Sequence, residues 1–489
     1  MDSTRIPVVI GVGQVQQHVD DPEKAAEPLV LMHEAVALAA ADAGRPDLLA
    51  RTDSVYAIQG AWRYGNPARA IADAVGANHA LTIGTGFGGN LAQACMNDAA
   101  RAIARGEIGL ALLVGAECGR TRARARKLGK RVGWDSAPGE PDQRIGSLAS
   151  INHPSEDAHG IVRPSHVYAM FETAIRHRRG ESPAAHLARI SALWARMSEI
   201  ASGNPHAWLR KSLSADEIAT PSARNRMIAY PYPKLMNSNS SVDMGAALVV
   251  CSLALAERAG VDPGRFVFLH SGTDGHDHVA VSHRDSFHAS PAIRIAGQAA
   301  LRLADTTVDE IDHVDLYSCF PSAVQVAATE LGLSQDRPLS VTGGLTFGGG
   351  PLNDYVMHSI GTMALRLRTE PGTRGLVTAN GGFLSKHAFG VYSTEPPSKG
   401  FAYACPQDEI DRTPARGICD DHEGAFEVEA YTVDYDAKGA SRGMVACRLP
   451  DGRRAWATSD DRELARAMTE SEFCGRTGHR SAGGTFRIV

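Results

Sequence analysis

The sequence predicts an α/β protein made of two similar halves, followed by a smaller β-rich segment. Short apolar runs that end in glycine or another small residue alternate with helix-length stretches, which is typical of a sheet covered by helices. Two segments, 84–117 and 341–382, share one order: an FGG turn, a helix, a turn and an apolar strand. After 393–400, a stretch rich in proline, glycine and serine, apolar and polar residues alternate, which predicts strands.

The first half begins with four short apolar runs, at 7–14, 54–60, 79–86 and 109–117. Their helix-length separations predict a mostly parallel sheet. From 120 to about 239 the chain is basic, aromatic and loop-rich, which indicates an insertion.

The α/β pattern resumes with a buried run at 245–260 and continues through 261–275, 313–333 and 374–393. The remaining residues, roughly 80, carry turn signals in AKGAS and PDG and predict a separate β-rich domain.

Composition excludes several classes of protein. The chain has 489 residues, of which 43% are hydrophobic and 21% charged, as in globular enzymes. A net charge of -5 gives no reason to expect nucleic acid as a partner. The start lacks the pattern of a secretory signal, and the longest apolar run is shorter than the ~20 residues that span a membrane. We therefore expect a cytoplasmic protein without a membrane partner.

Cysteine and histidine spacing does not favour a metal site. None of the eight cysteines forms a CxxC pair, and Cys405, Cys419, Cys447 and Cys474 are widely spaced. The segment 270–288 looks like a loop, and it contains His270, His276, His278, His283 and His288. Zinc or copper is conceivable at either place. We expect neither a metal nor a bound cofactor.

The two FGG turns indicate a shared binding site. Each delivers the start of a helix, whose free N–H groups can stabilise a developing negative charge. The second turn continues as GGGPLNDYVMHSIG, which carries Tyr355 and His358. Neither turn has the spacing or the lysine of a nucleotide-binding loop. The turns could therefore face a common site between the two halves, and neither is marked as a nucleotide-binding loop.

Besides the two FGG turns, five stretches carry a resemblance to a known family. In order along the chain they are MNDAARAIARGEIGLALLVGAE, MNSNSSVDMGAALVVCS, VDLYSCFPSA, GGGP and TANGGFLSKHAFG. Over about residues 5–395 the chain resembles the thiolase superfamily, and within it the sterol-carrier-protein-type thiolases and thiolase-like proteins. The resemblance implies a duplicated five-layer α-β-α-β-α core. Its N-terminal half would comprise 1–118 and 240–260, its inserted loop domain 119–239, and its C-terminal half 261–395.

The last segment, 401–489, resembles the added C-terminal domain of type 1 thiolase-like proteins, and we expect it to be OB-like. In related proteins that cleave sterol side chains, a small OB-fold partner accompanies the thiolase-like chain. The resemblance thus implies that this domain docks a protein partner.

Four catalytic positions of the family differ in this chain. Gly89 stands near the place of the nucleophilic cysteine, and Gly350 stands where the family motif GHP has histidine. Ala379 replaces the second cysteine, and Tyr317 replaces the histidine of the HDCF motif. A glycine cannot attack a thioester, so the resemblance implies a thiolase-like site without the standard cysteine chemistry.

The resemblance still implies a frame that binds CoA or an acyl-CoA. Tyr317, His358 and Tyr355 are the candidate catalytic residues. The expected acyl or CoA pocket consists of Gly88, Gly89, Asn90, Cys319, Gly349, Gly350, Asn380, Gly381 and His387. The basic run RTRARARKLGKR is either a solvated face or the place where Arg120, Arg122 and Arg124 neutralise the CoA phosphates.

Four functions remain open. The leading hypothesis is a CoA- or acyl-CoA-binding member of the acetyl-CoA acetyltransferase family that lacks classical thiolase activity. One alternative is a lyase that cleaves a β-hydroxyacyl-CoA, with Tyr317 as base assisted by Tyr355 or His358. Another is a non-catalytic carrier or assembly subunit. The last is a conventional thiolase that uses Cys95 or Cys319. We expect a monomer or a homodimer.

Overall fold

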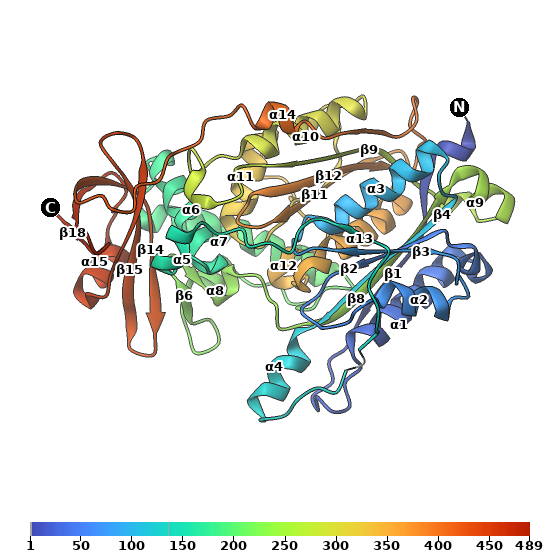
Figure 1. The fold of residues 1–489 in the computed structure, drawn as a ribbon, viewed down its shortest axis with the longest axis horizontal. Coiled ribbons are helices and arrows are strands. Elements are labelled where there is room, and N and C mark those ends of the chain that lie inside the picture. The colour runs from blue at the N-terminus through green and yellow to red at the C-terminus, as the bar shows by residue number, and fades with distance from the viewer. Residues whose placement is uncertain (1, 135) are drawn as a thin grey trace.

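The computed structural model describes residues 2–134 and 136–489, and its centre is one large mixed sheet (Figure 1). In spatial order its strands are β10 (His313–Asp315), β11 (Arg374–Gly381), β12 (Lys386–Ser393), β9 (Val267–His276), β1 (Pro7–Gln16), β8 (Asp243–Ser252), β4 (Leu110–Cys118), β2 (Ser54–Ile58), β3 (Leu81–Thr85) and β5 (Gln143–Ile145), with β13 (Ala402–Ala404) beside β9. The two halves meet where β1 pairs with β9, through Val8–Phe268 and Val9–Val267.

The sheet is mixed, so the prediction of a mostly parallel sheet is wrong. Strands β2, β3 and β4 run parallel, whereas β8 lies antiparallel to both β1 and β4. In the second half a short connection joins β11 to β12, and such a connection can only return the chain antiparallel. The apolar runs predicted strands, but runs buried on both faces carry no signal of direction.

Helices form three layers around this sheet. On the outer side of the first half lie α1 (Pro28–Ala43), α2 (Pro67–Ala74) and α9 (Leu253–Ala259). Between the halves lie α3 (Leu91–Arg105) and α13 (Tyr355–Thr369), and outside the second half lie α10 (Pro291–Leu303) and α11 (Pro321–Leu331). Strand β1 contributes to two cores, because Val8 and Ile10 pack with α1 while Val9 packs with α3. These layers give the expected five-layer α-β-α-β-α core.

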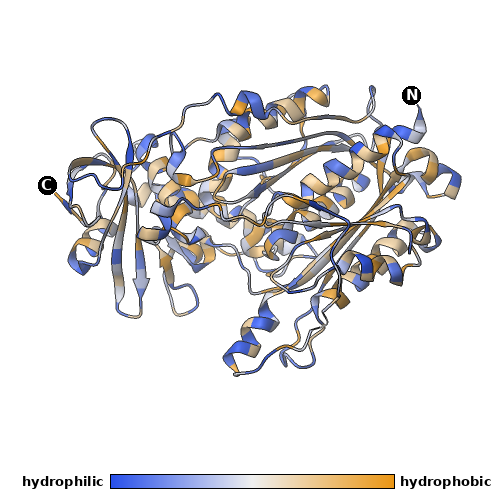
Figure 2. Cartoon of the chain, viewed as in Figure 1, coloured by the Kyte–Doolittle hydropathy of each residue, from blue (hydrophilic) through white to orange (hydrophobic). Residues whose placement is uncertain are grey.

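The insertion is more helical than the loop-rich sequence suggests. It contains α4 (Gly119–Lys127), α5 (Pro154–His159), α6 (Pro164–Arg179), α7 (Pro183–Gly203) and α8 (Ala215–Ala219), and then the short strands β6 (Met227–Ala229) and β7 (Tyr232–Pro233). Proline at the start and glycine at the end bound α6, at Pro164 and Gly180. Figure 2 shows α4 as mainly hydrophilic, and this helix projects from the first half.

The C-terminal domain is an antiparallel β-structure with one helix. Its strands are β14 (Gly424–Asp436), β15 (Gly439–Arg448), β16 (Arg454–Ser459), β17 (Thr477–Arg480) and β18 (Phe486–Ile488), and α15 (Arg462–Glu470) lies between the third and the fourth. A parallel bridge between Thr458 and Thr485 brings the ends of the sheet together, as in an OB-like barrel. This confirms the β-rich, OB-like prediction.

The domain is less separate than the sequence pattern suggested. Strand β6 of the insertion pairs with β14 through Ala229 and Asp434, so the insertion contributes to the sheet of the C-terminal domain. Helix α6, also part of the insertion, packs on β14 as well.

The remaining elements are short. They are the helices α12 (Gly344–Phe347) and α14 (Gln407–Ile410) and the 3-10 turns η1 (Ser3–Arg5), η2 (Pro46–Arg51), η3 (Lys234–Met236), η4 (Pro263–Arg265), η5 (Val281–His283), η6 (Val308–Glu310) and η7 (Leu352–Asp354). The segment 270–288, expected as a loop, begins within β9 and includes His270 on that strand.

Candidate active site

The two halves bring several predicted residues together at the start of α3. Gly89 lies against the hydroxyl of Tyr317 and the carbonyl oxygen of Asn380. Beside it, the amide of Asn90 contacts Gly381. One site therefore combines the first FGG turn with the YSCF and NGG segments of the second half.

Tyr317 occupies the space that a side chain at position 89 would need. A Cβ atom built on Gly89 would lie 2.3 Å from the Tyr317 hydroxyl and 2.6 Å from the Asn380 carbonyl oxygen. Real Cβ atoms essentially never approach other heavy atoms more closely than 3.0 Å. Position 89 must therefore be glycine while Tyr317 keeps this position.

The second glycine turn is filled in the same way. A Cβ atom on Gly350 would lie 2.3 Å from Oγ of Ser238, and the Gly350 N–H donates to the Asn239 carbonyl at 3.0 Å. Gly349 has a φ of +115°, which favours glycine. Ser238 thus stands where a histidine side chain of the GHP motif would begin. Ser238 lies in the stretch MNSNSSVDMGAALVVCS, whose sequence alone predicted no role for it.

Tyr355 supports Tyr317 and has its own hydrogen bonds. The two rings meet edge to face, with centroids 5.5 Å apart. The Tyr355 hydroxyl donates to Oδ1 of the buried Asp315 at 2.9 Å and lies 2.6 Å from Oγ1 of Thr342. Burial, together with the negative Asp315, raises the pKa of Tyr355 well above its usual value. Tyr355 is therefore suited to hold Tyr317 in position.

Burial keeps the cysteines of this region protonated. It raises the pKa of Cys319 to about 12 and that of Cys95, within α3, well above its usual value. A thiol attacks a thioester as thiolate. Hydrogen bonds, including one from the Phe320 N–H at the start of α11, lower the pKa of Cys319, but burial outweighs them, and Cys95 has only raising influences. These environments disfavour the conventional thiolase alternative.

Asn380 and Asn90 have unused hydrogen-bonding capacity. Asn380 Nδ2 donates to the Tyr168 hydroxyl at 2.8 Å, and the Leu384 N–H donates to the same hydroxyl at 2.9 Å. The buried amide oxygens of Asn380 and Asn90 have no hydrogen-bond partner among residues 2–134 and 136–489. An unpartnered buried acceptor is costly, so these oxygens are suited to accept from a ligand.

His358 faces away from Tyr317. Its Nδ1 lies 2.9 Å from Oε1 of Gln14 on β1, whereas Tyr355 contacts Asp315 on β10 of the second half. Its Nε2 lies 3.4 Å from a carboxylate oxygen of Asp354. Burial lowers the pKa of His358 to about 3 and raises that of Asp354, so the two groups form a neutral pair.

The hydrogen-bond partners of His387 likewise do not include Tyr317. It is the cross-strand neighbour of Asn380, and its Nε2 lies 3.2 Å from the Leu384 carbonyl and 3.4 Å from Oγ of Ser290. Burial lowers the pKa of His387 to about 4. It is therefore neutral at physiological pH.

The three arginines lie on α4 and have carboxylate partners. Asp20 lies 2.7 Å from Arg120 and 2.8 Å from Arg124, and Glu117 lies 3.3 Å from Arg122. An incoming phosphate would compete with these carboxylates. Their role in binding CoA stays a prediction.

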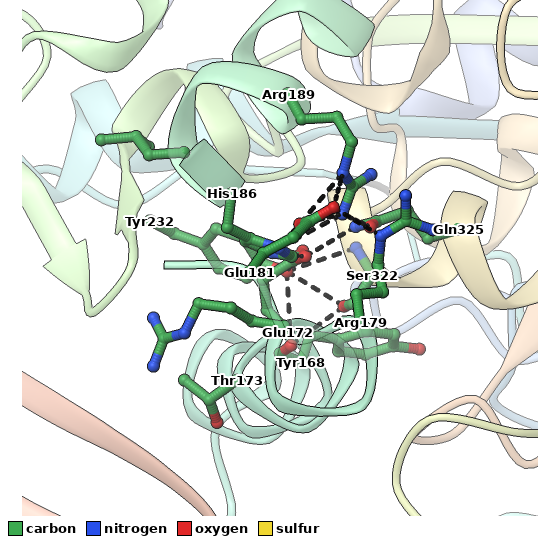
Figure 3. A network of polar contacts seen from close by, with 12 residues as sticks. Tyr168, Glu172, Thr173, Arg179, Glu181, His186, Arg189, Tyr232, Ser322 and Gln325 are labelled. Carbon is green, nitrogen blue, oxygen red and sulfur yellow. Dashed lines mark hydrogen bonds and ion pairs between the residues drawn. The ribbon is translucent and has the colours of Figure 1, made fainter. Parts of the chain in front are cut away.

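A buried polar network supports the site from the insertion (Figure 3). At its centre Glu172 accepts from the Tyr232 hydroxyl at 2.5 Å and from Nε2 of Gln325 at 2.6 Å. His186 lies between Glu172 and Glu181, with its ring nitrogens 2.5 and 2.7 Å from their oxygens. Burial would raise the pKa of Glu172, but His186 and these donors lower it overall. Arg189 and other donors likewise outweigh burial and hold Glu181 near a pKa of about 2.

Both carboxylates therefore act as hydrogen-bond acceptors in this network. The network reaches the site through Tyr168, whose carbonyl accepts from Ser322 at 2.9 Å and whose ring stacks on Phe320 at 4.6 Å. Sequence reasoning missed Tyr168 and Glu172, because no local motif marks them within the insertion.

Residues 2–134 and 136–489 contain neither a metal-binding cluster nor a membrane-spanning helix. Within those residues no three histidine, cysteine or acidic side chains cluster in a way that could hold a metal ion. Of the helices in that part of the chain, none combines the length and apolar character needed to cross a membrane.

The chain is similar to several known proteins. Residues 406–485 match the family model "Thiolase-like protein type 1 additional C-terminal domain". A monomeric SCP2-thiolase-like protein type 1 from Mycobacterium smegmatis is 30% identical, with a TM-score of 0.85 and full coverage of both chains. The Ltp2–ChsH2(DUF35) aldolase has a similar fold, with 21% identity, a TM-score of 0.57, and coverage of 81% of this chain and 98% of that one.

A curated relative is more distant. The acetyl-CoA acetyltransferase of Methanothermobacter thermautotrophicus is 24% identical over an alignment of 236 residues that covers 45% of this chain. The match spans 58% of that relative's length.

Proposed function

Because the chain belongs to the SCP2-thiolase-like type 1 proteins, we propose that it binds CoA or an acyl-CoA at the Tyr317 site without forming a covalent acyl-enzyme. The observation that carries this proposal is the position of Tyr317, whose hydroxyl fills the space beside Gly89 that a nucleophilic side chain would need. The similarity to an acetyl-CoA acetyltransferase supports CoA as the ligand class.

The chemistry of the site agrees with binding without a nucleophile. The start of α3 supplies N–H groups that can stabilise a thioester oxygen. The unpartnered oxygens of Asn90 and Asn380 can accept from amide groups such as those in the pantetheine arm. Burial keeps Cys319 protonated and therefore a poor nucleophile.

Calorimetric titration with CoA, acetyl-CoA and longer acyl-CoA esters tests the proposal, with intact-mass spectrometry on the same samples. We expect binding without added mass. Asn380→Ala should weaken binding roughly tenfold, because it removes a buried acceptor for the ligand. The control Asn78→Ala, at an exposed position, should bind like the wild type. A covalent adduct, or no binding by the wild type, would refute the proposal.

A lyase acting on a β-hydroxyacyl-CoA is the second candidate, favoured by the hydroxyl of Tyr317 at the start of α3. In this reaction the β-hydroxyl loses its proton, the bond between the α and β carbons breaks, and the enolate formed on the thioester takes up a proton. Burial raises the pKa of Tyr317, so near neutral pH its hydroxyl can donate to the enolate oxygen. It can act as base only as pH rises.

Tyr317→Phe separates the two candidates. For a lyase, the change should abolish cleavage while acyl-CoA affinity stays nearly constant. For a binding protein there is no cleavage to lose. If affinity and cleavage fell in parallel, Tyr317 would be a binding residue and its role as base would be excluded.

We also propose that the protein is a monomer. Strand β5 pairs with β3 at the edge of the sheet, through Gly84–Arg144 and two neighbouring pairs. Strand β3 is thereby covered, and the exposed edge is β5, a strand of only three residues, which offers little backbone for a second copy of the chain to pair with. The C-terminal domain remains a candidate docking surface for a protein partner, as implied by the related partnered proteins.

A further inference from the structure

A cavity of about 490 Å³ lies beside the start of α3. It is bounded by that helix, the segment 146–151, the ends of β9 and β12, and the start of α14. The predicted pocket residues Asn90 and His387 lie on its wall, but Tyr317 and Gly350 do not. Its volume is within the range of small-molecule sites, about 300–1,000 Å³.

One side of this cavity is apolar. Phe87, Leu91, Ile151 and Val279 contribute to it, and apolar atoms make up most of the lining. Phe87 is 48% exposed, which is unusual for a phenylalanine in this chain. An aliphatic chain placed here would remove this ring from water, which is favourable.

The other side carries one lysine. Lys386 is half-buried, and its ammonium has no ion pair or hydrogen bond with the residues that the structure describes. Burial lowers the pKa of Lys386 from its usual value. A cation in an apolar cavity without a partner is costly, and an anion beside it would offset that cost.

The other titratable groups of the cavity leave this cation uncompensated. Burial raises the pKa of Asp274 to about 6, and one of its oxygens accepts from Nδ2 of Asn97 at 3.2 Å. His276 is the cross-strand neighbour of Lys386, and its Nδ1 lies 3.0 Å from the Asp277 carbonyl. His387 is neutral, as described above. Neither Asp274 nor any other described carboxylate lies within ion-pair distance of the ammonium.

We propose that this cavity binds a linear aliphatic carboxylate, with its chain against Phe87, Leu91 and Ile151 and its carboxylate on Lys386. The proposal goes beyond CoA binding and does not depend on it, because the contacts involve neither a thioester nor Tyr317. Charge complementarity selects a carboxylate over an uncharged lipid of the same length.

Cys405 provides a local probe of occupancy. It lines the same cavity and is exposed, whereas the other seven cysteines are buried. Alkylation by iodoacetamide, followed at this residue by peptide mass spectrometry, should therefore slow when the cavity is filled. We expect octanoate to protect Cys405 in a saturable way, and octan-1-ol to protect it only at much higher concentration.

Two substitutions test the role of the charge. Lys386→Met keeps the length of the side chain and should raise the half-protecting octanoate concentration roughly tenfold or more. Lys386→Arg restores the charge and should stay close to the wild type. A thermal melt of each variant checks that it is folded.

Three results would overturn the proposal. Equal protection by octanoate and octan-1-ol would show an apolar cavity without carboxylate recognition. Unchanged protection in Lys386→Met would exclude Lys386. No protection by octanoate would exclude the site altogether. A CoA titration of the same samples reports on the Tyr317 site independently, so failure of one proposal is distinguishable from failure of the other.

Discussion

Arg176 on α6 donates two hydrogen bonds to the carboxylate of Glu472, from Nε at 2.8 Å and from Nη2 at 3.0 Å. The same guanidinium donates to the hydroxyls of Tyr230 and Tyr431 at 3.0 and 2.6 Å. Arg176 belongs to the insertion, and Glu472 belongs to the C-terminal domain. A buried charge therefore joins the two parts of the chain.

Replacing Arg176 should release this contact. Arg176→Met leaves Glu472 without its charge partner, and breaking a buried pair in this way costs about 3–5 kcal/mol in the free energy of unfolding. Urea unfolding should show this loss. Arg462→Met, which removes an exposed pair with Asp436, is the control and should cost no more than about 1 kcal/mol. Equal losses in both variants would show that Arg176 contributes no more than a surface charge.

Restoring a side chain at position 89 should destabilise the protein. Gly89→Ala places its Cβ against the Tyr317 hydroxyl, and overpacking of this kind costs about 1–3 kcal/mol. Gly133→Ala is the matched control, because a Cβ there meets open space. Adding Tyr317→Ala should make the Gly89→Ala change less costly. Additive losses in the double variant would contradict a direct clash.

The Asp354–His358 pair predicts a pH dependence of stability. Burial holds the folded-state pKa of His358 near 3, below its usual 6.5, so protons bind preferentially to the unfolded chain between these values. His358 therefore removes stability as pH falls below 6.5, by about 2 kcal/mol at pH 5. Asp354 has the opposite sign. Its raised pKa removes stability as pH rises above 3.8 and continues to do so up to the folded-state value, so between pH 5 and pH 7 Asp354 opposes His358.

His358→Asn isolates the histidine contribution. Urea unfolding at pH 7 and pH 5 should show that lowering the pH costs this variant about 2 kcal/mol less in the free energy of unfolding than it costs the wild type. His79→Asn, at an exposed position, should show the same difference between the two pH values as the wild type. If His358→Asn also matched the wild type, the histidine would be protonated in the folded protein.

Strand β5 should prevent association through the sheet edge. We expect one molecular mass, that of a 51.9 kDa monomer, over a wide range of concentrations in size-exclusion chromatography with light scattering. Arg144→Pro removes a backbone donor and disfavours the strand conformation of its neighbours, so it should expose β3 and promote association. Gln143→Ala keeps the backbone and should remain monomeric. A monomeric Arg144→Pro variant would show that β5 does not control association.

The sequence predicted the architecture well because repetition and periodicity are local signals. The two FGG segments predicted two halves, and the alternating residues after 400 predicted a β-rich domain. Strand direction was not predictable from apolar runs such as 245–260, since burial on both faces removes the alternation. The boundaries of the domains stay predictions.

The composition of the site was partly predictable. Substituted motif positions indicated that Gly89 and Gly350 lack the family side chains, but only the structure places Tyr317 and Ser238 in the vacated space. His358 follows Tyr355 by less than one helical turn, yet the two side chains contact different strands: Tyr355 contacts Asp315 on β10, and His358 contacts Gln14 on β1. Such directions depend on packing, which a linear motif does not encode.

The pairing of β6 with β14 has a consequence for biosynthesis. Ala229 leaves the ribosome roughly 200 residues before its partner Asp434, so the insertion cannot complete its edge until translation is almost finished. Until then β6 and the surface of α6 that later faces β14 stay uncovered and accessible to chaperones and proteases. A truncated mRNA thus yields a chain in which β6 and α6 lack their partner β14, and the cell can recognise and remove that chain.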